Sequence, residues 1–264
     1  MKSTSVRAQH AVEEPGADAE QISASLQKRV RVQLLLASFS LLLANLLALT
    51  LIEKPQDSSV FSQMYLTTLL LWLPLCALLW RGLSHHEHAR FGPANTLTLY
   101  RAAGTVVLAS WVPAVSLLST SGFWWLSVSA VFLLTLDGVD GYLARRTGLA
   151  SAFGARFDME IDALLTLIIS LLLWQSGEVG IWILSLGLMR YAFVLSGTLL
   201  KSLNEPLYPS FRRKLICVVQ LASLCLMLTP WLEPPWSSAL GLAACLLLSA
   251  SFARDTCWLL KTSS

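Results

Sequence analysis

The chain has 264 residues, of which 55% are hydrophobic and only 13% are charged. A soluble domain carries about 25% charged residues, so this composition excludes an ordinary soluble protein and favours one embedded in lipid. The formal net charge of +3 is too small to indicate a nucleic-acid partner.

Apolar runs recur along the chain, each with roughly the 17–25 residues that cross a bilayer as a helix. Strand-like alternation is absent, and helices satisfy their own backbone hydrogen bonds in lipid. The sequence therefore predicts an all-α integral membrane protein. The eight runs lie at residues 34–52, 60–80, 95–118, 123–143, 157–174, 179–200, 215–232 and 237–259.

The distribution of ionisable residues divides the chain into three parts. Residues 1–31 are polar and predict a disordered cytoplasmic tail, and residues 32–90 predict an accessory transmembrane hairpin with its linker. Residues 91–264 hold nearly all the ionisable residues within the spans, so we expect them to form a six-span catalytic core.

Basic residues gather in every second loop, and the intervening loops hold one Lys and no Arg. Positive charge favours the cytoplasmic side, so we expect a multi-pass inner-membrane protein with both termini and the basic loops in the cytoplasm. The basic residues are Lys28, Arg29 and Arg31, then Arg81, Arg90 and Arg101, then Arg145, Arg146 and Arg156, then Lys201, Arg212, Arg213 and Lys214, and finally Arg254 and Lys261.

Polar residues open the third run at a helical spacing. Pro93 suits the first turn of a helix, and Asn95, Thr98 and Arg101 follow at intervals of three, near one face. Seen alone, this pattern also fits a helix cap followed by an anchoring arginine.

The fourth and fifth runs carry a carboxylate cluster. Asp137 and Asp140 share a helix face with Gly141 and Ala144, and Asp158 and Asp162 share the next helix's face with Gly154. A short basic connection makes the two helices antiparallel, so the four carboxylates meet at the cytoplasmic side. Carboxylates inside a membrane are costly, and oxygen-only ligands suit hard divalent cations. The alternative is that the aspartates only pair with Arg145, Arg146 and Arg156.

These residues resemble a known family. The pattern D-x-x-D-G-x-x-A-R-x8-G-x-x-x-D-x-x-x-D is the signature of the CDP-alcohol phosphotransferases, also called CDP-alcohol phosphatidyltransferases. The chain matches every fixed position from Asp137 to Asp162. The resemblance extends over about residues 95–260 and implies the family's six-helix core, with the hairpin before it as an addition.

The resemblance implies transfer of a phosphatidyl group from a CDP-linked donor to an alcohol, with release of CMP, in phospholipid biosynthesis. Asp137, Asp140 and Asp158 would hold two divalent ions, Mg²⁺ or Mn²⁺, and Asp162 would be the general base while also contacting a metal. The donor would be CDP-diacylglycerol, and the family forms homodimers. The implied donor-binding residues are Asn95, Thr98, Arg101, Asp137, Gly141, Ala144, Arg145 and Gly154.

The acceptor is indicated by further basic residues. Arg190 lies at the end of an apolar run, and Arg212, Arg213 and Lys214 precede the seventh; together they suit a phosphate on the acceptor. Lys214 to Gln220 partly resembles a G-K-x-x-T-x-x-Q element of the family. Glycerol 3-phosphate is our first choice, as in phosphatidylglycerophosphate synthases. The alternatives are inositol phosphate, serine, an amino alcohol with a CDP-alcohol donor or, from a different class, a cation-binding membrane transporter.

Overall fold

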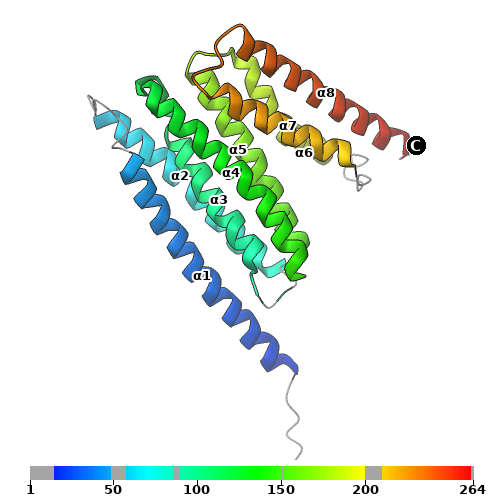
Figure 1. The fold of residues 1–264 in the computed structure, drawn as a ribbon. Helices are drawn as coiled ribbons and strands as arrows, with labels where there is room; N and C mark the ends of the chain where they lie inside the picture. Colours follow the sequence, from blue (N-terminus) through cyan, green and yellow to red (C-terminus); the bar gives the residue numbers. More distant parts are fainter. Residues whose placement is uncertain are drawn as a thin grey trace, which may run out of the picture.

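A computed structural model describes residues 15–48, 58–85, 88, 90–149, 151–199 and 210–262. Across these residues the chain is helical and contains no strand (Figure 1). This confirms the predicted all-α fold class. The α-helices are α1 (Pro15–Ala48), α2 (Ser58–Gly82), α3 (Pro93–Ser110), α4 (Thr120–Thr147), α5 (Ala152–Gln175), α6 (Leu184–Leu199), α7 (Phe211–Met227) and α8 (Trp236–Thr262).

Each predicted apolar run falls on one of these helices. Among the described residues, four helices, α1, α2, α4 and α8, are long and apolar enough to cross a membrane by length and composition. The others differ for two reasons: α6 and α7 have only 16 and 17 residues, and α3 and α5 carry the polar residues of the predicted site.

Two helix boundaries differ from the sequence prediction. The third run was expected to continue to residue 118, but α3 ends at Ser110 and a 3₁₀ segment, Val112–Leu117, follows. Pro113 explains the break, because proline has no N–H to continue the helix. At the other end, the described part of α1 (Pro15–Ala48) includes residues of the segment predicted as a disordered tail. Residues 1–14 lie outside the described residues.

Helix α3 lies at the centre of the packing. The hairpin helices α1 and α2 pack on it, and so do α4 and α5, whereas α6 packs on α5 and α7 packs on α8. Figure 1 shows this order, with α6 to α8 grouped on the far side of α4 and α5. Val30 and Leu41 of α1 are buried with Ala103 of α3 in one apolar cluster. The hairpin therefore buries one face of the helix that carries Arg101.

Large apolar side chains cover much of the outer surface. Leu35 is 71% exposed, Phe39 67% and Leu70 64%, and Leu195 and Leu246 are similar. Soluble proteins seldom expose continuous apolar surface of this extent. These side chains face outward because lipid, not water, surrounds the helices.

Candidate active site

The ends of α4 and α5 bring two pairs of aspartates together. Helix α4 ends at Thr147 and is capped by Gly148, whose φ of 66° is the left-handed conformation that commonly closes a helix. Helix α5 begins after Ser151, whose hydroxyl accepts a hydrogen bond from the Gly154 N–H at 3.0 Å. This tight connection reverses the chain. Helices α4 and α5 both pack against α3, and the aspartates of the two helices converge there.

Arg101 of α3 occupies the middle of the carboxylate cluster. It is completely buried. One guanidinium nitrogen lies 2.7 Å from an oxygen of Asp140 and 2.6 Å from one of Asp158. The other lies 3.0 Å from Asp137 and also pairs with Asp162. The structure thus gathers all four predicted aspartates around one cation that sequence reasoning had assigned to donor binding.

One guanidinium does not balance four carboxylates, so the site keeps a formal excess of three negative charges. Carboxylate oxygens of Asp137, Asp158 and Asp162 all lie within 4.8 Å of one another. Asp140 lies outside this group of three, and its Oδ1 is buried without a hydrogen-bond partner. Unbalanced charge, closely spaced oxygens and an unpartnered buried oxygen together fit divalent cations, which prefer such ligands.

Two more of the predicted donor residues on α3 are buried beside the cluster, and one of them contacts it. The Thr98 hydroxyl lies 3.2 Å from Oδ2 of Asp140 and can donate to it. Asn95 donates to the Phe91 carbonyl at 2.6 Å. Its Oδ1 lies so close to Gly154 that a Cβ there would stand 2.5 Å away. Gly154 therefore lets α3 and α5 approach closely, and its role in donor binding stays a prediction.

The remaining donor residues lie on α4. Ala144 is half-buried and Arg145 is exposed. A guanidinium nitrogen of Arg145 lies 3.5 Å from where a Cβ on Gly141 would be. The Arg145 side chain thus lies along the Gly141 backbone, on the helix face that carries Asp137.

Three of the four predicted acceptor residues pair with carboxylates that sequence reasoning missed. Arg190 of α6 pairs with Glu160 of α5 at 2.5 Å. Arg212 and Arg213 of α7 both pair with Asp255 of α8, at 3.0 and 3.4 Å. Lys214 is exposed and makes no ion pair with the described residues. One available signal was Asp255 itself, since a carboxylate within an apolar run indicates function.

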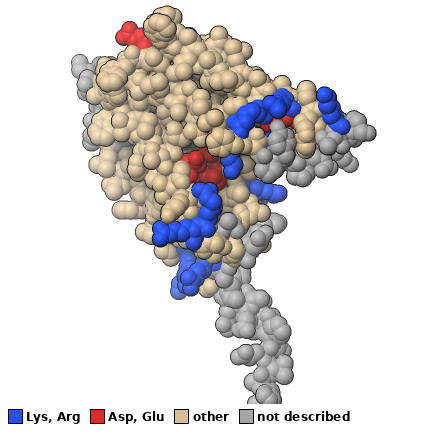
Figure 2. Space-filling view, turned by 45° about the vertical axis from the view of Figure 1, so that its right-hand side comes forward, with Lys and Arg blue, Asp and Glu red and all other residues tan. Residues whose placement is uncertain are grey.

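The basic residues lie near the carboxylates. Helix α5, which carries Asp158 and Asp162, packs against α6 and α7, the helices that carry these basic residues. Figure 2 shows an acidic patch on the molecular surface with basic side chains on both sides of it. The structure therefore places a carboxylate site and a basic site next to each other.

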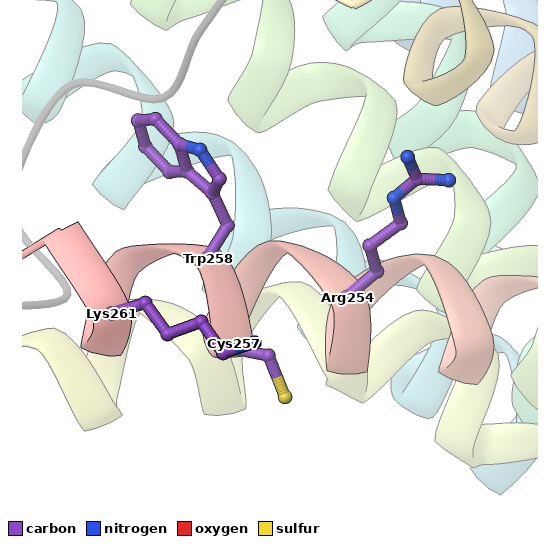
Figure 3. A pocket seen from close by; sticks show the side chains of 4 residues that line it. All are labelled: Arg254, Cys257, Trp258 and Lys261. Atoms are coloured by element: carbon purple, nitrogen blue, oxygen red, sulfur yellow. The ribbon is translucent and has the colours of Figure 1, made fainter.

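A cavity of about 600 Å³ lies along the C-terminal part of α8. Among the described residues it is lined by Arg254, Cys257, Trp258 and Lys261, which share one side of the helix (Figure 3). The carboxylates are absent from this lining. We therefore do not assign this cavity to the site.

Comparison with known proteins agrees with the geometry. The family model described as CDP-alcohol phosphatidyltransferase matches residues 91–250, which include α3 to α7 and all four aspartates. No match was found among the curated proteins or the solved structures. The match covers more than half of the chain and belongs to a family of enzymes, not of transporters. The chain belongs to the CDP-alcohol phosphatidyltransferase family, and it is a membrane-embedded transferase of phospholipid biosynthesis that moves a phosphatidyl group from a CDP-linked donor to an alcohol.

Proposed function

We propose that the protein transfers a phosphatidyl group from CDP-diacylglycerol to a phosphorylated alcohol and releases CMP, with Mg²⁺ or Mn²⁺ bound at the aspartates. Glycerol 3-phosphate is the first candidate for the acceptor. The observation that carries the proposal is the carboxylate cluster around Arg101, whose negative charge exceeds what the guanidinium balances. The diphosphate of the donor is also negatively charged, so cations at the aspartates are needed for it to approach them.

The charge of the neighbouring basic site favours a phosphate on the acceptor. This basic site contains two carboxylates, Glu160 and Asp255, and four basic side chains, Arg190, Arg212, Arg213 and Lys214. It therefore has a formal excess of two positive charges. A phosphate monoester carries a charge of about −1.5 to −2 at pH 7. The two charges match, whereas serine or an amino alcohol would leave the basic site unbalanced.

Asp137, Asp140 and Asp158 would hold the divalent cations, which when bound neutralise the diphosphate and polarise its phosphorus. We assign Asp162 as the general base, which also contacts a metal. Its side chain is 38% exposed, against 3% for Asp140, so an acceptor hydroxyl can reach it. The acceptor oxygen forms a bond to the phosphorus of the phosphatidyl group while the bond to CMP breaks. The hydroxyl proton passes to Asp162, and CMP leaves with the bonding electrons.

Arg101 would bind the donor as well as the aspartates. It pairs with all four of them, so it holds the carboxylates together before a donor arrives. The proposed donor site also includes Asn95, Thr98, Gly141, Ala144, Arg145 and Gly154.

We further propose that the site and both termini face the cytoplasm of a cell with an inner membrane, and that the protein forms a homodimer. The first part rests on the basic residues, because the described ones cluster at the end of the bundle that carries the aspartates. The homodimer rests on family resemblance.

The test uses the purified full-length protein in lipid nanodiscs, with labelled CDP-diacylglycerol and a panel of alcohols. We expect CMP release that requires Mg²⁺ or Mn²⁺ and is fastest with a phosphorylated alcohol. Asp162→Asn should lower kcat by about 10²–10⁴-fold, the usual contribution of a general base. Glu233→Gln, an exposed carboxylate in the loop before α8, is the matched control and should keep full activity.

Two results would contradict the proposal. Full transfer activity in Asp162→Asn would remove Asp162 from the role of base. Equal rates with glycerol and glycerol 3-phosphate would show that the enzyme does not require a phosphate on the acceptor.

A further inference from the structure

Asp255 stands out among the ionisable residues that the proposed reaction does not use. It lies on α8, its side chain is only 5% exposed, and it accepts hydrogen bonds from Arg212 on Oδ1 and from Arg213 on Oδ2. A buried carboxylate is costly unless it is paired. Here each carboxylate oxygen accepts a hydrogen bond from a different arginine, so Asp255 links two neighbouring cations of α7.

Ser251 completes the arrangement one helical turn earlier. Its hydroxyl accepts a hydrogen bond from the second terminal nitrogen of Arg212 at 3.0 Å, and it is itself buried. Arg212 is therefore held on two sides, by a carboxylate and by a hydroxyl. Both partners lie just beyond residues 91–250, the part of the chain that the family model matches.

We propose that Asp255 is a positioning residue for the acceptor site, which fixes Arg212 and Arg213 in the orientation that receives the acceptor phosphate. The inference rests on the proposed function. An arginine loses side-chain rotamer freedom when a ligand immobilises it, and this loss weakens binding. Two arginines fixed in advance remove that cost from binding. Asp255 also separates their like charges, which lets both point toward one anion.

Location supports this role over simple anchoring of α8. Helix α7, which carries the arginine pair, packs against α8 and also against α5, the helix that carries the proposed base. The side chains of Arg212 and Arg213 keep 32% and 28% of their surface exposed. An anion can therefore reach them although their partner is buried.

Removing the carboxylate has two opposing effects on acceptor binding. It raises the net positive charge, which by itself attracts an anion more strongly, and it releases both arginines from their fixed orientation. Our proposal requires the second effect to dominate. A hydrogen bond to a charged group is strong enough to change affinity about tenfold or more. A rise in KM for the acceptor therefore supports the proposal, and a fall contradicts it.

The experiment compares Asp255→Asn with the wild type in nanodiscs containing CDP-diacylglycerol and Mg²⁺. We expect KM for glycerol 3-phosphate to rise at least about tenfold. We expect KM for the donor, and kcat at saturating acceptor, to stay within about twofold. Asp255→Glu, which keeps the charge, should recover part of the loss. Glu233→Gln is the control and should change neither KM.

Ser251→Ala provides a second variant should Asp255→Asn fail to fold. It removes one hydrogen bond from Arg212 and keeps the carboxylate, so it should raise KM for glycerol 3-phosphate by a smaller factor, again without changing KM for the donor.

Several outcomes would overturn the inference. An unchanged or lower acceptor KM in both variants would show that Asp255 does not position the arginines. Equal rises in both KM values, with a lower melting temperature, would assign Asp255 to stability alone. A wild type that transfers no phosphatidyl group to any alcohol would instead refute the proposed function. Failure of the two ideas is therefore distinguishable.

Discussion

The contact between Gly154 and Asn95 leads to our sharpest prediction about the site's architecture. A Cβ at position 154 would stand 2.5 Å from Oδ1 of Asn95 and 3.2 Å from Oγ of Ser151. Ordinary contact begins at 3.4 Å. The Asn95 side chain cannot turn away freely, because it donates to the Phe91 carbonyl. Gly154→Ala therefore has to separate α3 from α5, the helices that carry Arg101 and Asp158.

The magnitude follows from packing. The contact is short by about 0.9 Å, and overpacking of this kind costs about 1–3 kcal/mol. Alanine gains up to about 1 kcal/mol over glycine in a helix, which partly hides the effect. Gly138→Ala on α4 is the matched control, since a Cβ there meets nothing within 4 Å. The two alanine variants should therefore differ in stability by about 1–3 kcal/mol.

The assay is reversible unfolding in mixed micelles, measured for each variant. Asn95→Ala removes the atom that the new Cβ meets, so Gly154→Ala should cost much less in that background. A double-mutant cycle measures this coupling directly. Equal stability of the Gly154 and Gly138 variants, or a coupling energy near zero, would refute the reasoning. Because the readout is stability, the result does not depend on whether Asn95 binds the donor.

Three further predictions concern other parts of the molecule. Arg101→Met leaves four carboxylates without a cation, so it should cost about 3–5 kcal/mol of stability in a chelator and less in Mn²⁺; equal melting in both conditions would contradict it. Burial raises the pKa of the Glu178 carboxyl, and Glu233 raises it further. The ionised form is therefore disfavoured on folding, and Glu178→Gln should raise the melting temperature at pH 7 but not below the ordinary carboxyl pKa of about 4.3. Asn45 accepts a hydrogen bond from Ser110 at 2.9 Å, so Asn45→Leu should lower stability by about 1 kcal/mol, measured by unfolding; an unchanged midpoint would show that this bond does not hold the hairpin.

Local patterns predicted much of this protein. Helical spacing in Asp137–Asp140 and Asp158–Asp162 was sufficient to place two carboxylate faces, because neighbours three or four apart always share a side of a helix. Apolar runs predicted each α-helix of the described residues, because a helix satisfies its own backbone hydrogen bonds in lipid. Helix ends were less certain, as at Ser110, since capping and proline act against the apolar pattern.

Tertiary structure alone decided which charges meet. Nothing local to Arg101 indicates that it pairs with four aspartates on two other helices. The separation of these residues along the sequence does not give their distance in space. The same holds for Asp255 with Arg212 and Arg213, and for Glu160 with Arg190. The sequence by itself determined the family, the fold class and the carboxylate motif. The packing of α3 between α4 and α5, and of α7 on α8, decided how those charges are balanced, because Coulomb energy depends on distance in space.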